Sequence, residues 1–233
     1  MATKTQSRAA RVHDLVRADI LAGRLRPGAP LRLAALAQAY DASMSVVREA
    51  LGRLAEHKLA VLSPNQGFRV VEVSIDDLRA LTELRILIEG KALERSIAVG
   101  DLQWEAAVVS AHHLLERAGE ETSADGHPTD EWSDAHAAFH HALIAACDNQ
   151  RMLDLASSLR DSAEIYRQLS AAGEGAADRD VAGEHRSLME LATRRSPEAV
   201  DVLATHLQRT TDLLLSSPLL GELEDQAGPP GSR

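Results

Sequence analysis

Apolar residues recur at intervals of three and four along most of the N-terminal part of the chain, which is the spacing of one face of an α-helix. The pattern predicts helices over residues 8–22, 33–40 and 43–57. Four apolar residues fall on one face of the first of them: Val12, Leu15, Val16 and Ile20. Two β-prone runs, 59–62 and 68–71, flank a turn and predict a hairpin. Three short helices and a hairpin are typical of a winged helix-turn-helix.

The rest of the chain shows the helical spacing almost without interruption. It predicts helices over residues 75–98, 101–118, 130–147, 149–170, 178–194 and 197–215. We therefore expect a mainly α protein, with an N-terminal winged helix-turn-helix and a C-terminal antiparallel all-helical bundle. The expected domains are residues 1–73 and 74–218. The tail, residues 219–233, is rich in Gly, Pro and acidic residues and is predicted to be disordered.

The composition excludes several classes of protein. Aromatic residues make up 3% of the chain, which disfavours a large β-sandwich or barrel. A single cysteine, Cys147, allows neither an intrachain disulfide nor a cysteine-based zinc site. No apolar run approaches the roughly 20 residues of a membrane span, and the N-terminus lacks an apolar signal core. We expect a cytoplasmic protein that does not associate with membranes.

The charge is divided unevenly between the two parts. Residues 1–70 carry 11 basic and 5 acidic side chains, whereas residues 71–233 carry 14 and 30. The formal charge of the whole chain is -10, so the total hides a basic N-terminal part. A polyanion such as double-stranded DNA is therefore a plausible partner for the N-terminal part alone.

The third predicted helix has the surface of a DNA-recognition helix. Its apolar residues face inward, and short or basic residues lie on the opposite side near its N-terminus. The outward residues are Met44, Ser45, Arg48, Gly52 and Arg53, and Ser43 is a good N-cap. Arginine can contact guanine bidentately, while serine hydroxyls and a helix N-terminus suit phosphate. The alternative is a basic face that only contacts solvent.

The whole N-terminal part resembles the GntR type of regulators. The resemblance is carried by 20–28 with Leu31, by Leu36-Ala37, Ser43, 47–51 and Leu54, and by Leu59 with 67–70. It implies that Ser43 and Arg48 contact DNA and that the wing tip, Gln66-Gly67, approaches the minor groove. Met44 stands where the family usually has arginine, and Arg32 is a candidate for a phosphate contact instead.

Four of the ten histidines occupy inward positions on three helices of the predicted bundle: His136, His140, His185 and His206. A buried imidazole needs partners for its nitrogens, and an ordinary hydrogen bond is the simpler explanation for a single one. A metal ion would satisfy one nitrogen of all four at once. We interpret the remaining histidines as surface or non-ligand residues: His13, His57, His112, His113, His127 and His141.

The C-terminal part resembles the FCD ligand-binding domain of the FadR subfamily. The matching residues are 84–89, Phe139-His140, Asn149, Glu184-His185 and His206-Leu207. The resemblance implies a divalent metal bound by an aspartate and three histidines. His136 stands at the aspartate position, so we expect an all-histidine site that favours zinc or nickel over hard, oxygen-loving ions.

Arg85 lies in an inward stripe of the first helix of the bundle. An unpaired buried guanidinium is costly, so one interpretation is an internal salt bridge, for instance with Glu89. The other is that Arg85 awaits the carboxylate of a small metabolite whose second oxygen reaches the metal. Other candidate partners for this ligand are Arg160, Arg167 and Gln168.

Together these features predict a ligand-responsive transcription regulator, a repressor that binds a pseudo-palindromic operator as a homodimer. One alternative is a metal sensor in which the ion is the signal. Another is a histidine-ligated metal hydrolase. The hydrolase is disfavoured because the chain has no HExxH-type helix and no glutamate that clearly serves as a base. We therefore expect that the protein is not an enzyme.

Overall fold

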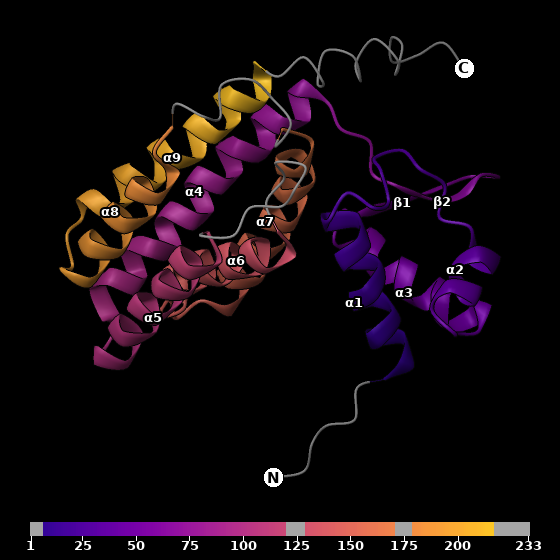
Figure 1. Ribbon diagram of the computed structural model, residues 1–233, viewed down its shortest axis with the longest axis horizontal. Helices are drawn as coiled ribbons and strands as arrows, with labels where there is room; N and C mark the ends of the chain where they lie inside the picture. Colours follow the sequence, from indigo (N-terminus) through magenta and orange to yellow (C-terminus); the bar gives the residue numbers. More distant parts are fainter. Residues whose placement is uncertain (1–6, 120–128, 171–178, 217–233) are drawn as a thin grey trace. The chain divides into compact units, whose positions relative to one another are not determined.

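The computed structural model describes residues 7–119, 129–170 and 179–216 (Figure 1). The chain divides into two compact units, Met1–Val73 and Ser74–Arg233. The predicted tail over residues 219–233 and His127 lie outside the described residues.

The N-terminal unit consists of three helices and a hairpin. Its elements are α1 (Arg8–Leu21), α2 (Leu33–Ala39), α3 (Met44–Glu56), β1 (Ala60–Ser63) and β2 (Gly67–Val70). The strands pair antiparallel, from Ala60 opposite Val70 to Ser63 opposite Gly67. The chain before α2 joins the hairpin, because the Leu31 amide donates to the carbonyl of Phe68 at 2.8 Å. The unit therefore has the elements of the predicted winged helix-turn-helix.

The core of this unit forms where α1 crosses α3. Val16, Ile20, Val47 and Leu51 are almost completely buried there. The interpretation of Leu15 as an inward residue was wrong: its side chain is 40% exposed. The buried face of α1 consists instead of Ala9, Val12, Val16 and Ile20. These residues follow one another at spacings of three and four, whereas Leu15 falls on the flank of this stripe.

All the regular secondary structure among the described residues of the C-terminal unit is helical. It contains α4 (Ile75–Val99), α5 (Leu102–Ala118), α6 (Asp130–Ile144), α7 (Gln150–Ser170), α8 (Val181–Thr193) and α9 (Glu198–Leu215). Side-chain caps begin four of these helices: Ser74 for α4, Asp101 for α5, Thr129 for α6 and Asp180 for α8. The predicted fold class, mainly α with a small antiparallel hairpin, is confirmed.

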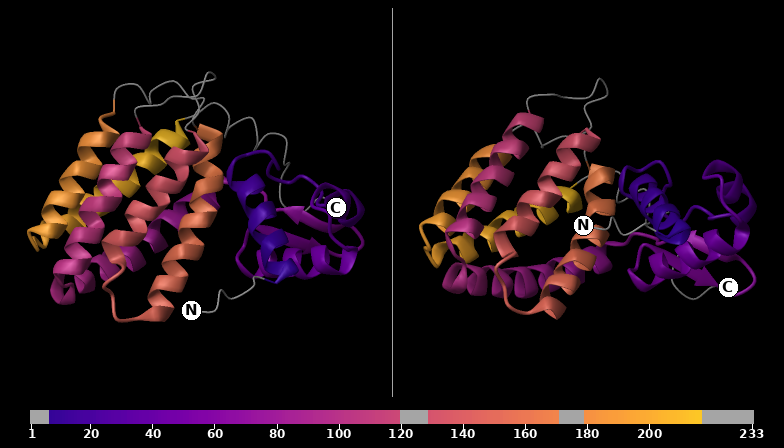
Figure 2. Two further views of the ribbon diagram at one scale, coloured as in Figure 1. Left: turned by 60° about the horizontal axis from the view of Figure 1, so that its bottom comes forward. Right: turned by 90° about the horizontal axis from the view of Figure 1, so that it is seen from below.

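The helices of this unit pack as a bundle (Figure 2). Helix α4 lies against α7 and α9, while α5 lies against α6 and α8. Apolar side chains fill the interior, among them Leu93, Phe139, Leu188 and Leu203. None of the helices described is both long and apolar enough to span a bilayer. The interior also holds a small number of polar side chains, and these define the candidate site.

Candidate metal centre and nucleic-acid interface

Four histidines converge inside the helical bundle. Helix α6 contributes His136 and His140, α8 contributes His185, and α9 contributes His206. One nitrogen of each ring lies within 4.8 Å of the corresponding nitrogens of the others. Three of the rings are buried and His136 is partly exposed. The structure thus brings together the four histidines that the sequence pattern placed on inward faces.

The imidazole nitrogens in this cluster lack ordinary partners. Both nitrogens of His140 and Nε2 of His185 are buried, and no hydrogen-bonding group among the described residues reaches them. The ring centroids of His140 and His206 lie 5.2 Å apart, and those of His185 and His206 lie 4.8 Å apart. Buried polar atoms are normally paired, because leaving one unpaired costs about 1–3 kcal/mol. The donor set therefore fits a divalent metal that accepts one lone pair from each ring.

Burial, assisted by neighbouring charges, favours the neutral form of these rings. Burial lowers the pKa of His136 and His140 well below the usual value, and the neighbouring histidines lower it further. Burial, with the charge of His206, lowers the pKa of His185 to about 3. A neutral imidazole has a free lone pair on one nitrogen, which is the form that ligates a metal.

His206 has a carboxylate partner that sequence reasoning missed. Its Nδ1 lies 2.8 Å from Oε2 of Glu184, and Arg179 holds the same carboxylate through Nε and Nη2. Burial alone would raise the pKa of Glu184, but the hydrogen bond with His206 and the Arg179 guanidinium hold it well below its usual value. The only sequence signal was the position of Glu184 beside a candidate ligand, His185.

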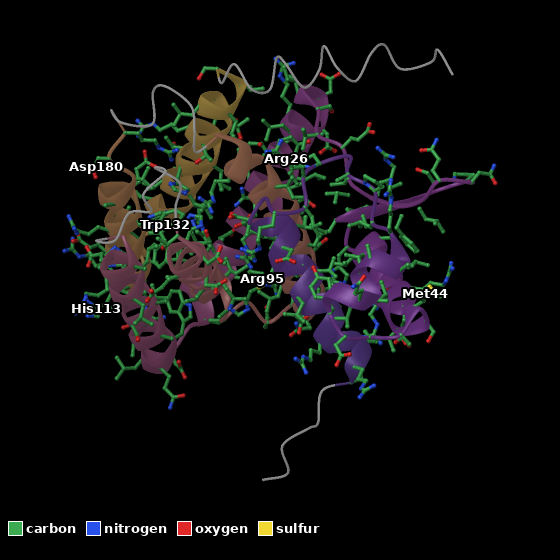
Figure 3. The ribbon with its side chains drawn as sticks, turned by 45° about the vertical axis from the view of Figure 1, so that its right-hand side comes forward. Arg26, Met44, Arg95, His113, Trp132 and Asp180 are labelled. Atoms are coloured by element: carbon green, nitrogen blue, oxygen red, sulfur yellow. The ribbon has the colours of Figure 1, made fainter. Side chains whose placement is uncertain are left out.

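His136 is held by an aromatic stack. Its ring lies 4.7 Å from the ring of Trp132, with 13° between the planes. The guanidinium of Arg167 lies 4.8 Å from the Trp132 centroid, and its Nη2 donates to Oγ of Ser133 at 2.9 Å. Figure 3 labels Trp132 among the helices of the bundle. Arg167 was a candidate partner for the effector carboxylate. In the structure its guanidinium packs on Trp132, the residue that stacks on His136.

Arg85 forms the internal salt bridge that was one of its two interpretations. Its Nε donates to Oε1 of Glu89 at 2.7 Å, and Nη1 of Arg160 lies 3.8 Å from the other carboxylate oxygen. Glu89 is only 1% exposed, so one buried carboxylate serves two guanidiniums and a positive charge remains. Within the described part of the chain, no acceptor reaches the Nη groups of Arg85. The side chain of Gln168 lies outside the described residues.

Arg85 also lies within electrostatic range of the histidines. After burial and the neighbouring ionisable groups, its charge further lowers the pKa of His140 and of His206. The excess positive charge around Glu89 therefore acts electrostatically on the four-histidine cluster. This arrangement could accept an anion between Arg85 and a metal.

His112, interpreted from the sequence as a surface or non-ligand residue, is buried and is not part of the four-histidine cluster. It is 3% exposed, and its ring packs edge-on against Phe139 at 5.5 Å. Helix α5 turns His112 toward the core, because it follows Val108 at a spacing of four, while His113 next to it is exposed (Figure 3).

The candidate nucleic-acid interface lies on the exposed face of α3. Ser43 caps the helix by accepting from the Val46 amide, and its Oγ lies 2.9 Å from that of Ser45. Arg48 is exposed, and Met44, 58% exposed, projects from the start of the helix (Figure 3). Arg53 is also exposed, but its Nη2 donates to Glu49 one turn earlier at 2.7 Å.

The remaining predicted DNA contacts are also on the surface of the N-terminal unit. Arg32 is exposed at the N-cap of α2. At the wing tip Gln66 and Gly67 are exposed, and Asn65 and Gly67 have positive φ angles of 63° and 77°. Glycine and asparagine tolerate this conformation, which produces the tight turn between the strands.

Comparison with known proteins gives matches for both units. A family model described as "Bacterial regulatory proteins, gntR family" matches residues 8–70, and one described as "FCD domain" matches residues 80–209. The HTH-type transcriptional regulator BphR of Paraburkholderia xenovorans is 37% identical over 207 residues, covering 88% of this chain and 84% of BphR. The HTH-type transcriptional repressor GlaR of Escherichia coli K12 is 33% identical over 149 residues, covering 64% of this chain and 67% of GlaR.

Solved structures agree with this comparison. The crystal structure of a transcriptional regulator GntR from Rhodococcus sp. RHA1 superposes with a TM-score of 0.73 at 25% identity. The superposition covers 90% of this chain and 98% of that protein.

The lowered pKa values of the buried histidines predict how acid destabilises the metal-free protein. Between about pH 6.5 and the lower folded-state value, about 3 for His185, the unfolded chain binds protons that the folded chain does not. The free energy of unfolding should therefore fall with falling pH, by about 1.4 kcal/mol per pH unit for each such histidine.

Urea titrations with a chelator present, at a series of pH values, measure this slope. His185→Gln should lower the slope of the free energy of unfolding against pH by the amount that corresponds to about one bound proton. His57→Gln, at an exposed position, should leave the slope unchanged. An identical slope for His185→Gln and the wild type would show that the ring takes up its proton equally well in the folded state.

Proposed function

Because the chain belongs to the GntR family of bacterial regulatory proteins and carries an FCD domain, we propose that it is a repressor controlled through the four-histidine centre. Membership of this family makes it a DNA-binding transcriptional regulator and not an enzyme, so the hydrolase alternative is dropped. The observation that carries the proposal is the convergence of four neutral imidazoles, three buried and one partly exposed, within electrostatic range of Arg85. The similar regulator GlaR is named a repressor, which supports repression over activation for this protein.

The two units have different proposed roles. Residues 1–73 bind DNA, and residues 74–218 bind the metal and the effector and form a homodimer. Helix α3 enters the major groove, where Arg48 reads a base and Ser43, Ser45 and Arg53 contact the backbone. Met44 offers an apolar contact of the kind that suits a thymine methyl group. Arg32, Gln66 and Gly67 extend the contact to phosphates and to the adjacent minor groove.

A homodimer on a pseudo-palindromic operator follows from the size of this surface. One recognition helix of 13 residues places few side chains against base edges. Two copies related by a two-fold axis double those contacts on two half-sites, which is how small helix-turn-helix units reach specific affinity.

The donor set defines the ion that we propose. Four neutral imidazoles suit zinc or nickel, whereas magnesium and calcium prefer oxygen ligands. His136 occupies the position of the aspartate that the resemblance to FCD domains implies. The ligand set therefore carries no negative charge. When bound, the ion supplies a positive centre that joins α6, α8 and α9 and attracts an anionic ligand.

We propose that the effector is a small carboxylate. Glu89 holds Arg85 through Nε only, which leaves its two Nη groups for a bidentate contact with the ligand. The second guanidinium on the same buried carboxylate, that of Arg160, adds to the positive charge. The negative charge of the carboxylate would neutralise the positive charges of both Arg85 and the metal. Binding of the metal should therefore raise the affinity for the effector, and binding of the effector should raise the affinity for the metal.

A chain of contacts links the proposed effector site to the start of the C-terminal unit. Arg160 lies on α7, and Tyr166 of the same helix donates to Oδ2 of Asp77 at 2.6 Å. The Tyr166 hydroxyl also accepts from the Ser74 amide at 3.2 Å, at the N-cap of α4. Helix α4 carries Arg85 and begins only a few residues after β2. A ligand that repositions α4 relative to α7 would therefore act directly on the segment that leads to the DNA-binding unit.

The proposed base contact predicts the effect of Arg48→Ala on operator affinity. Loss of a bidentate contact should weaken binding by about 1–3 kcal/mol and relax specificity at one base pair per half-site. Gel-shift titrations measure both effects, with an operator obtained by binding selection from random double-stranded DNA and with single-base variants of it. Arg194→Ala, which removes an exposed arginine from the C-terminal unit, is the control and should bind as the wild type does. Equal binding by Arg48→Ala and the wild type would remove Arg48 from the interface.

The metal centre predicts a stability that depends on the ion. A metal that binds only the folded state stabilises it by RT ln(1 + [L]/Kd), about 2.7 kcal/mol at a hundredfold excess over Kd. Chelator should lower the melting temperature, and Zn²⁺ or Ni²⁺ should restore it. His185→Ala should lose this response, while His113→Ala, an exposed histidine of α5, should keep it. A full metal response in His185→Ala would contradict the centre.

The effector site predicts which ligands release DNA. We expect one or more members of a panel of small mono-, di- and hydroxycarboxylates to weaken operator binding of the zinc-loaded protein about 5- to 150-fold. Arg85→Gln should abolish this effect, while Arg79→Gln, an exposed position of the same helix, should not. Release by zinc alone, without any carboxylate, would identify the protein as a metal sensor instead. An active carboxylate that works equally well on Arg85→Gln would contradict the proposed site.

A further inference from the structure

The ion pair formed by Arg179 and Glu184 lies directly behind one of the four histidines. Glu184 is on the first turn of α8, and Arg179 precedes the N-cap of that helix, Asp180. Both side chains are largely buried, at 11% exposed for Arg179 and 13% for Glu184. A surface ion pair contributes little, but a buried pair held in one geometry orients the groups that it contacts.

The geometry determines which nitrogen of His206 carries the proton. Oε2 of the ionised Glu184 accepts only, and it lies 2.8 Å from Nδ1 of His206. An unprotonated Nδ1 would place two lone pairs against each other at this distance. His206 therefore carries its proton on Nδ1 and keeps its lone pair on Nε2. Nη2 of Arg179, 3.2 Å from Nδ1, donates instead to Glu184 and to the His206 carbonyl, which is 3.0 Å away.

Arg179 leaves Glu184 little freedom to turn. Nε of Arg179 donates to Oε1 at 2.9 Å while Nη2 donates to Oε2, which is the bidentate arrangement. Nη1 of Arg179 donates to Oγ1 of Thr210 at 2.9 Å, and Arg209 donates to Oε1 at 3.2 Å. Thr210 and Arg209 both follow His206 on α9. The carboxylate is thus fixed relative to the helix that carries the ring it orients.

We infer that Glu184 is a positioning residue of the four-histidine centre, that it directs Nε2 of His206 to the ion, and that Arg179 holds Glu184 in place. This inference rests on the metal site proposed above. A carboxylate that accepts from the non-ligating N–H of a histidine fixes the orientation of the ring and makes the ligand more basic. It also places a negative charge one hydrogen bond from a ligand set that has none of its own.

The test is the affinity of the full-length protein for Zn²⁺, measured by competition with a chromogenic chelator. Glu184→Ala should bind zinc about 10- to 100-fold more weakly than the wild type. Glu184→Gln keeps an acceptor oxygen but no charge, so it should lose less. Arg179→Met, which frees the carboxylate without removing it, should also lose less than Glu184→Ala. Glu190→Gln, an exposed glutamate of the same helix, is the matched control and should bind normally.

A second measurement separates positioning from folding. The visible absorption of Co²⁺ in the same site depends on ligand geometry, so it should change in Glu184→Gln even where the metal-free melting temperature equals that of the wild type. If Glu184→Ala does not fold, Glu184→Gln and Arg179→Met decide the question by the same two measurements.

The outcomes distinguish this inference from the proposal on which it rests. Wild-type zinc affinity and an unchanged Co²⁺ spectrum in the Glu184 variants would overturn the positioning role if His185→Ala loses the metal. Failure of the wild type itself to bind zinc or cobalt would instead overturn the metal centre, and the positioning role with it.

Discussion

Four imidazoles that converge inside an apolar bundle, three of them buried, are the constraint on which the C-terminal unit depends. Both nitrogens of His140 and one of His185 have no hydrogen-bond partner among the described residues, and burial keeps the rings neutral. Each unpaired buried polar atom opposes folding by about 1–3 kcal/mol. Binding an ion at the cluster would remove this cost and stabilise the folded bundle. The rings come from three helices, so satisfying them joins α6, α8 and α9.

The surroundings of the cluster are organised by charge. On one side, Arg85 and Arg160 share the buried carboxylate of Glu89, which leaves a positive charge near the rings. On another, Glu184 contacts His206 and is held by Arg179. The first arrangement suits an anionic ligand and the second orients a metal ligand. One centre could thus couple metal and effector binding to helix α4, the element that directly follows the DNA-binding unit along the chain.

Helical periodicity was sufficient to predict the elements and the four clustered histidines. Each of these histidines lies three or four residues from an apolar core residue on its own helix, so its direction follows from the helix alone. The same argument failed for Leu15, which lies on the flank of the buried stripe of α1 and is 40% exposed. The pairing of Glu184 with His206 was not accessible either, because it joins α8 to α9 and depends on tertiary packing.

X-ray absorption spectroscopy at the zinc or nickel edge of the full-length, metal-loaded protein tests the central claim most directly. The account predicts at least three, and without effector four, imidazole nitrogens at about 2.0–2.1 Å, with the outer-shell scattering that is characteristic of the ring. His185→Ala should lose one of these rings or the metal altogether. A coordination shell dominated by oxygen, with no imidazole scattering, would show that the four histidines do not hold the ion.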